Sequence, residues 1–306
     1  MRTASPRKMK SPLCARIPIG PVSSKANPKK EPEVIWYLTR TYKRKIAATF
    51  SQKILVSFEI TRIEDDSTMD VATAKRTQQE CFEQMRKGGM KPIERMDCFK
   101  KFETSNPDIE LVKQFYDMWG AEYDIDMVVA EYKNTVDVAS ETEKFFPNNK
   151  DIKILDVGAG TGLGGKDLAA CGFTNIDATD GSSGMLEEAK KLDVYKNILP
   201  AEVLVKGQKM LSVAPGTYDV IASSGSFYPC HLQGYHLPCF LDCVKTGGLL
   251  IISSCPHNDE GVNLRPVLAQ LEADGIIKIV KETYVPKWFR DDDGDVFVLE
   301  KLNPLD

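Results

Sequence analysis

A glycine-rich turn follows a short apolar segment in the middle of the chain, and its residue types suit a nucleotide-like ligand. The stretch covers residues 152–162, with an acidic residue at Asp156 and glycine at every second position from Gly158 to Gly162. Apolar, β-branched residues bounded by glycines are typical of a buried parallel strand. Alternate glycines let the backbone turn tightly against a ligand. A helix over residues 163–171 would then point its free N–H groups at that ligand.

A second acidic residue, Asp180, lies 24 positions beyond Asp156, at the end of the next expected strand. A carboxylate there can accept two hydrogen bonds from a ribose diol. Two registers of the glycines compete. Residues 160–165 fit G-x-G-x-x-G, the fingerprint of nicotinamide cofactors, but this register starts late for a turn that leaves the strand. The other register starts at Gly158, directly at the strand end. A nicotinamide-dependent oxidoreductase is the alternative hypothesis, although no Tyr-x-x-x-Lys follows downstream.

The apolar pattern after residue 150 predicts alternating strands and helices. Strands are expected at 174–180, 201–205, 218–223, 248–253, 276–283 and 296–299, and helices at 184–192, 236–244 and 264–273. Such alternation builds an α/β fold with a doubly wound, seven-stranded, mostly parallel sheet. The last two strands have only a loop, 284–295, between them, which predicts an antiparallel hairpin at one edge.

Residues 106–150 are expected to form a helical lid before the core at 151–306. Pro107 suits the first position of a helix that Asn106 would cap. A second helix is expected over 126–145. The aromatic residues Phe115 and Trp119 lie at helical spacing, and we interpret them as core packing.

Residues 1–105 are expected to be a largely disordered, basic extension, with 22 Lys and Arg against 12 Asp and Glu. Residues 1–33 in particular are too polar to bury a core. Within the extension, residues 70–104 have a helix-like composition that stops at 85–90. A mitochondrial address is a minor alternative to a cytoplasmic location, because prolines interrupt any amphipathic helix near the start.

Composition narrows the possible partners. Residues 106–306 carry 18 Lys and Arg against 32 Asp and Glu, which argues against a nucleic acid partner. No apolar run approaches the roughly 20 residues that span a bilayer, so no membrane partner is expected. The eight cysteines fit no structural zinc spacing, and the acidic run 291–295 lacks the ligand spacing of a calcium loop. No metal is therefore expected, and the oligomeric state is left open.

Four segments carry a resemblance to a known family. Residues 155–162 resemble the first motif of class I S-adenosylmethionine-dependent methyltransferases, and residues 178–186 the second, with its acid and a Ser-x-x-Met-Leu continuation. Residues 218–222 resemble the fourth strand and 244–250 the turn before the fifth, with Thr246 in place of the usual proline. The resemblance covers residues 107–302 and implies a Rossmann-like transferase. Within the class, the chain is similar to the group of methyltransferase-like protein 27, the Williams–Beuren region group.

The resemblance implies S-adenosylmethionine as cofactor and a role for each matching residue. Residues of the glycine loop would lie along the methionine part and the ribose, and Asp180 would hold the ribose hydroxyls. Met185 would pack on the adenine, although its position also fits an ordinary helix core residue. Gly207 and Gln208 would approach adenine or form an ordinary polar loop, and Tyr116 and Tyr123 would belong to a lid or to the core. The full set of expected cofactor-binding residues is Asp156, Gly158, Ala159, Gly160, Gly162, Asp180, Gly181, Ser182, Met185, Gly207, Gln208, Ser223, Ser224, Tyr116 and Tyr123.

The methyl acceptor is not specified by any motif. A base is needed only if the acceptor is protonated at neutral pH, and His231, after the fourth strand, is the candidate; an ordinary hydrogen-bonding role is the alternative. No Asp/Asn-Pro-Pro-Tyr sequence of the amino-methylating nucleic-acid enzymes is present. A small molecule is therefore the first choice of acceptor and a protein the second. A protein that binds the cofactor without turnover is a further alternative.

Overall fold

Seven strands form the sheet of this protein. The computed structural model describes residues 69–255, 262–289 and 292–305, which fall in the second of two units, residues 66–306. The strands are β1 (Ile154–Val157), β2 (Ile176–Thr179), β3 (Asn197–Ile198), β4 (Tyr218–Phe227), β5 (Val244–Ser254), β6 (Ile277–Phe289) and β7 (Asp292–Lys301). Disorder and the alternative mitochondrial address are predicted for residues near the start of the extension. Those residues lie outside the described ones.

The strand order is β3-β2-β1-β4-β5-β7-β6, and it confirms the predicted doubly wound sheet. β1 pairs in parallel with both β2 and β4, with Ile154 opposite Ile176 and Val220. β7 is antiparallel to β5 and β6, so the expected antiparallel hairpin is present at one edge. The strand order reverses between β1 and β4, with β2 next to β1. In such sheets, ligands bind at the carboxyl ends of the strands beside this point.

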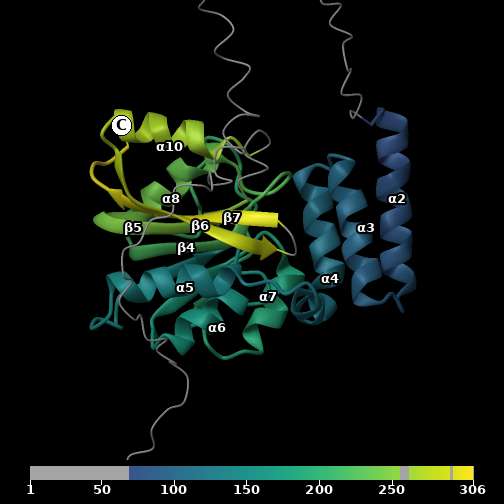
Figure 1. Cartoon of the computed structure of the whole chain (residues 1–306), viewed down its shortest axis with the longest axis horizontal. Helices are drawn as coiled ribbons and strands as arrows, with labels where there is room; N and C mark the ends of the chain where they lie inside the picture. Colours follow the sequence, from purple (N-terminus) through teal and green to yellow (C-terminus); the bar gives the residue numbers. More distant parts are fainter. Residues whose placement is uncertain (1–68, 256–261, 290–291, 306) are drawn as a thin grey trace, which may run out of the picture. The chain divides into compact units, whose positions relative to one another are not determined.

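Helices cover both faces of the sheet (Figure 1). They are α2 (Val71–Lys87), α3 (Pro92–Thr104), α4 (Ile109–Val129), α5 (Asn134–Phe145), α6 (Leu163–Ala170), α7 (Ser183–Lys190), the 3-10 turn η2 (Gly234–His236), α8 (Leu237–Cys243) and α10 (Leu264–Ala273). Successive strand residues point to opposite faces. Leu155 therefore packs with Phe240 of α8 and Leu268 of α10, whereas Ile154 packs with Val138 of α5 and Leu168 of α6.

A third apolar cluster joins α2, α3 and α4, which Figure 1 draws beside the sheet. Phe82, Phe102, Phe115 and Trp119 form its centre, and each is at most 6% exposed. Phe102 and Phe115 stack with ring centroids 4.7 Å apart. The interpretation of Phe115 and Trp119 as core residues is confirmed.

Two consequences follow for the predicted domains. The helix-like composition of 70–104 is confirmed, with α2 ending at Gly88 (φ +66°), so the expectation of disorder through residue 105 is wrong for 71–104. The three amphipathic helices together supply enough aromatic surface to form a core, whereas none of them could do so alone. In addition, α5 packs on the sheet, so the helical cluster consists of α2, α3 and α4 and not of residues 106–150.

The boundaries of α4 and α5 also differ from the prediction. Asp108 caps α4, because its carboxylate accepts the Leu111 N–H at 2.9 Å, whereas Asn106 has φ +50° and lies outside the helix. A helix does not begin at Asp126, which lies inside α4 and is buried. The chain turns instead at Glu131 (φ +54°), and α5 starts at Asn134.

The predicted strand at 201–205 is wrong. The third strand is the two-residue β3, Asn197–Ile198, and residues 201–205 run on without regular pairing. Glu202 donates its N–H to the Asp180 carbonyl at 2.9 Å, so the segment passes the end of β2 rather than extending the sheet. The expected loop 284–295 is also shorter than predicted, because β6 continues to Phe289 and β7 begins at Asp292.

Candidate functional site

The glycine loop after β1 is fixed to the ends of the two neighbouring strands. Gly158 and Gly160 adopt φ of +70° and +57°, which residues with a side chain rarely adopt. The N–H groups of Gly158 and Ala159 donate to the Thr179 carbonyl at 3.0 and 3.1 Å. A Cβ on Gly158 would lie 2.1 Å from the Ser226 Oγ on β4. Only glycine therefore fits at position 158.

Asp156 supports this loop from below. It is 2% exposed, and its Oδ2 accepts the Tyr195 hydroxyl at 2.7 Å. The Tyr195 oxygen in turn accepts the Gly165 N–H of α6 at 3.1 Å. Burial raises the pKa of Asp156 to about 6, against the opposing effect of the Tyr195 hydrogen bond. Asp156 thus links β1 to the first turn of α6.

Asp180 organises the second loop. Its two carboxylate oxygens accept the Gly160 N–H at 2.9 Å and the Ser182 N–H at 2.8 Å. Burial raises the pKa of Asp180, and the two backbone hydrogen bonds oppose that rise. Each carboxylate oxygen has further lone pairs for a ligand. One side chain therefore ties the glycine loop to the start of α7 and still lines the space between them.

Helix α4 is bound to both loops. The Asp117 carboxylate accepts the Ser182 hydroxyl at 2.6 Å and the Gly184 N–H at 2.9 Å, at the first turn of α7. Further along α4, Asp124 accepts the hydroxyl of Thr161 in the glycine loop. The helix that carries Tyr116 and Tyr123 is thus positioned by polar contacts at two separate points.

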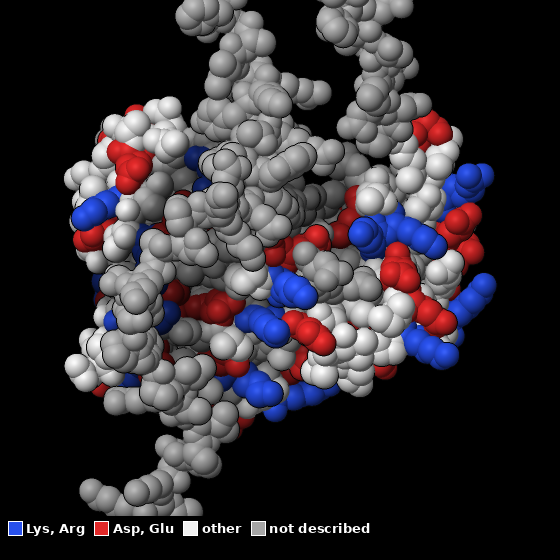
Figure 2. All heavy atoms as spheres, viewed as in Figure 1, with Lys and Arg blue, Asp and Glu red and all other residues white. Residues whose placement is uncertain are grey.

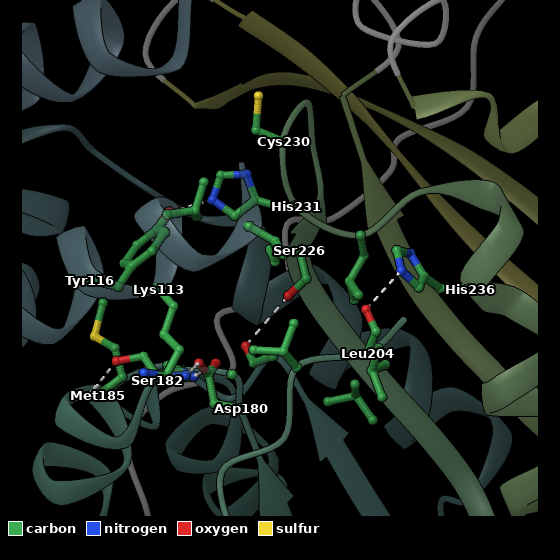
Figure 3. A pocket seen from close by; sticks show the side chains of 18 of the residues that line it. Lys113, Tyr116, Asp180, Ser182, Met185, Leu204, Ser226, Cys230, His231 and His236 are labelled. Atoms are coloured by element: carbon green, nitrogen blue, oxygen red, sulfur yellow. Dashed lines mark hydrogen bonds between the residues drawn. The ribbon is translucent and has the colours of Figure 1, made fainter. Parts of the chain in front are cut away.

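These elements line a cavity of about 510 Å³, which we call the main hollow. In Figure 3, Tyr116 and Lys113 from α4 lie opposite His231 and Ser226, with Asp180 and Ser182 along the floor. The predicted site residues that line the main hollow are Tyr116, Tyr123, Gly158, Gly160, Asp180, Gly181, Ser182, Met185, Ser224 and His231.

Six predicted residues do not line it: Asp156, Ala159, Gly162, Gly207, Gln208 and Ser223. Ser223 is fully buried and donates its hydroxyl to the Val157 carbonyl at 2.8 Å, beneath the loop. Gly162 (φ +97°) faces Leu192, 2.8 Å from a Cβ built on it. Gly207 and Gln208 were placed by the predicted strand at 201–205. Since that strand does not form, residues 202–206 line the hollow in their place.

The Tyr116 hydroxyl and the His231 Nε2 are 2.9 Å apart. The His231 Nδ1 lies 2.7 Å from the Pro229 carbonyl, which can only accept, so Nδ1 carries the proton. Nε2 is then the acceptor, and Tyr116 donates to it. Burial lowers the pKa of His231, which keeps the ring neutral at pH 7. The free ring nitrogen of His231, the candidate base, is thus hydrogen-bonded to Tyr116.

Several residues that line the main hollow were not predicted as site residues from the sequence. Ile109, Val112 and Lys113 share a face of α4 with Tyr116, and their spacing of three or four residues was a usable signal. Gly225, Ser226 and Cys230 follow because β4 continues past its predicted end. Leu204, whose carbonyl lies 3.2 Å from the His236 Nε2 in Figure 3, belongs to the irregular segment and had no signal.

Within residues 69–255, 262–289 and 292–305, no three His, Cys, Asp or Glu side chains are grouped so that they could hold a metal ion. No helix in the same ranges is both long and apolar enough to cross a membrane.

Comparison with known proteins identifies a domain within this chain. A family model described as "Methyltransferase domain" matches residues 154–248, which span β1 to the start of β5. The chain contains a class I S-adenosylmethionine-dependent methyltransferase domain. Methyltransferase-like protein 27 from Homo sapiens is 32% identical over 155 residues, which cover 48% of this chain. The matched region spans 59% of the length of that relative.

Solved structures also resemble the methyltransferase domain, with TM-scores below 0.5. Magnesium protoporphyrin IX methyltransferase from Synechocystis PCC 6803, with bound SAH, is 14% identical and has a TM-score of 0.48, with 64% of this chain and 100% of that chain covered. The 1,6-didemethyltoxoflavin-N1-methyltransferase from Burkholderia thailandensis is 14% identical, with a TM-score of 0.47 and 63% and 88% of the two chains covered.

The main hollow of the methyltransferase domain fits the family's cofactor, S-adenosylmethionine. Its volume lies within the usual range for small-molecule and cofactor sites. Asp180 offers carboxylate lone pairs for the ribose hydroxyls, and Met185 and Leu204 offer apolar surface for adenine. Thr179 lines the hollow, and its Oγ1 is buried without a hydrogen-bond partner among the described residues. A bound ligand that supplies that partner would remove its desolvation cost.

Proposed function

We propose that the chain transfers a methyl group from S-adenosylmethionine to a small-molecule acceptor. One observation carries the proposal: the glycine loop, Asp180 and the Tyr116–His231 pair line the same hollow. The two loops expected to bind the cofactor and the polar Tyr116–His231 pair thus border the same cavity. A transfer reaction requires donor and acceptor to be held next to each other, and this arrangement supports that.

The cofactor supplies a methyl group on a sulfonium, which is its own leaving group. The protein then has to bind, orient and exclude water. Asp180 and the glycine loop would hold the nucleoside end, and α4, locked through Asp117, would close the other side. His231 would act on a proton only through the Tyr116 hydroxyl, because that hydroxyl occupies its Nε2.

Charge and shape support a small acceptor over a macromolecule. On the face drawn in Figure 2, Lys and Arg are interspersed with Asp and Glu over α2 and α3 and form no continuous basic patch. The full chain has a net charge of −4, which is unfavourable for a nucleic acid partner. A concave site of this volume accommodates a small molecule more readily than a folded protein surface, so a protein acceptor is our second choice.

The test combines binding with transfer. Calorimetry with S-adenosylhomocysteine and with NADH, followed by incubation with methyl-labelled cofactor and fractionated lysate, separates the candidate functions. We expect S-adenosylhomocysteine to bind and a low-mass fraction to be labelled. Binding of NADH alone would favour the oxidoreductase, and binding without labelling in any fraction would favour a protein that only binds the cofactor.

Two matched arginine variants make the test specific. Gly160 (φ +57°) and Gly216 (φ +61°) both have open space around a Cβ, but only Gly160 lines the main hollow. Gly160→Arg is expected to weaken S-adenosylhomocysteine binding by about 100-fold or more, equivalent to about 3 kcal/mol. Gly216→Arg introduces the same backbone strain and is expected to retain binding.

A further inference from the structure

A second cavity of about 110 Å³ lies next to the main hollow, and we call it the aromatic chamber. The two cavities share Tyr116, Tyr123 and His231 as lining residues. Phe99 and Trp119 add further rings, with centroids 4.9 Å apart. A molecule in the chamber would therefore lie against aromatic side chains and next to the volume assigned to the cofactor.

Glu103, near the end of α3, lines this chamber and is buried without a partner. Its side chain is 10% exposed, and its Oε1 has no hydrogen bond to any described residue. The nearest basic group is the His231 Nδ1 at 3.9 Å, and that nitrogen already donates to the Pro229 carbonyl. A buried carboxyl group that lacks a partner is costly, so its presence calls for one.

A second residue that lines the same chamber carries an unpaired polar atom. Trp288 on β6 is 2% exposed, and its Nε1 has no hydrogen-bond partner among the described residues. An indole N–H can only donate. The chamber is thus lined by two residues with an unused polar atom, an acceptor on Glu103 and a donor on Trp288, together with aromatic rings and Lys100.

We propose that the aromatic chamber binds the methyl acceptor and that this acceptor is a small amine held by Glu103. This inference rests on the proposed function and names the substrate class of the same site. Ring faces attract cations, and a carboxylate pairs with an ammonium group, whereas an anion would be repelled. The Trp288 N–H would bind an oxygen or ring nitrogen elsewhere on the amine.

Glu103 would also take the proton that the reaction releases. An ammonium group has no lone pair. When the ammonium group binds, Glu103 releases its own proton to solvent and pairs with it as a carboxylate, and one proton then passes from nitrogen to that carboxylate before transfer. The amine lone pair then forms the N–C bond to the methyl group, the S–C bond breaks, and its electron pair stays on sulfur. Burial raises the pKa of Glu103 to about 9, which brings it near that of an alkylamine and suits it to this exchange.

The experiment uses three probes of one shape and different charge: benzylamine, benzyl alcohol and benzoate. Binding of each to the full chain, saturated with S-adenosylhomocysteine, is measured by calorimetry at pH 7.5. We expect benzylamine to bind at least about tenfold more tightly than the other two. Weaker or equal binding of benzylamine, or no binding at millimolar concentration, would overturn the proposal.

Two variants on α3 assign the effect. Glu103→Gln preserves shape and removes the carboxyl group that ionises when it pairs with an ammonium group, and it is expected to abolish the preference for benzylamine. Asp97→Asn changes an exposed carboxylate on the same helix and is expected to preserve it. A preference that survives Glu103→Gln would contradict the assignment. Since S-adenosylhomocysteine binding is measured separately and no turnover is needed, loss of the cofactor function would be recognised as a different failure.

Discussion

The Asp117 backbone of α4 lies directly against Gly184 of α7. A Cβ on Gly184 would be 2.7 Å from the Asp117 carbonyl oxygen and 2.8 Å from its Cα. The Asp117 carboxylate meanwhile accepts the Gly184 N–H at 2.9 Å. The close approach of the two helices therefore depends on a residue without a side chain, and it brings the Tyr116 face of α4 over the Asp180 loop.

We predict that Gly184→Ala loosens this contact. Alanine favours a helix over glycine by about 1 kcal/mol, but the clash is with backbone atoms that cannot rotate away. We expect a net loss of about 1–3 kcal/mol in the free energy of unfolding and weaker S-adenosylhomocysteine binding. Urea denaturation and calorimetry measure both effects. Ser183→Ala, at an exposed position on the same helix, is the control and should change stability by less than about 0.5 kcal/mol.

Asp126 is predicted to be the main polar determinant of stability in the helical cluster. It is fully buried, receives two hydrogen bonds from Arg95 at 2.6 and 2.7 Å, and accepts the Trp119 indole N–H at 2.7 Å. Asp126→Asn leaves the Arg95 charge buried, so we expect a loss of about 3–5 kcal/mol. Glu122, 3.4 Å from Arg95 but 53% exposed, is the control.

Glu122→Gln should cost at most about 1 kcal/mol. Urea denaturation followed by circular dichroism measures both variants. Equal losses would mean that burial does not set the strength of the two interactions.

Elements with strong local signals were predictable from the sequence. Apolar segments bounded by glycines located β1 and β2, and the two acids at their ends located the main hollow. Asp180 lines the hollow as expected because parallel strands end at one edge of the sheet. The long aromatic face of α4 likewise identified Phe115 and Trp119 as core.

Features set by tertiary contacts were not predictable. The segment 201–205 has strand-like residues, but Glu202 hydrogen bonds to the Asp180 backbone and the strand does not form. Asp156 has the sequence position of a ligand contact, yet Tyr195, 39 residues later, turns it inward. Glu103 gave no sequence signal, because its burial depends on rings from α4 and β6 that are distant in the chain.

Burial of Asp156 is predicted to make stability depend on pH, and the Tyr195–Asp156 hydrogen bond is predicted to limit that dependence. The pKa of Asp156 in the folded state, about 6, exceeds the ordinary 3.8, so the folded protein binds more protons between these values and stability falls as pH rises through them. The Tyr195 hydroxyl reduces that fall by stabilising the charged carboxylate. Tyr195→Phe should therefore cost about 2–3 kcal/mol at pH 8 and about 1 kcal/mol at pH 5. Denaturation at the two pH values measures this, and equal losses would contradict it.

Glu103→Gln is predicted to stabilise the ligand-free protein at alkaline pH. Burial raises the folded pKa of Glu103 from 4.5 to about 9, so the carboxyl group contributes full stability below pH 4.5 and loses it as pH rises toward 9. Lys100 opposes this rise in pKa, and burial lowers the pKa of the adjacent His231, which is neutral at pH 8.5. Glutamine has no charge to desolvate, so the variant should be more stable by about 1–3 kcal/mol at pH 8.5 and nearly unchanged at pH 5. Urea denaturation at both pH values, with Asp97→Asn as the exposed control, measures the difference. A variant less stable than the natural chain at pH 8.5 would mean that Glu103 has a partner in the folded protein.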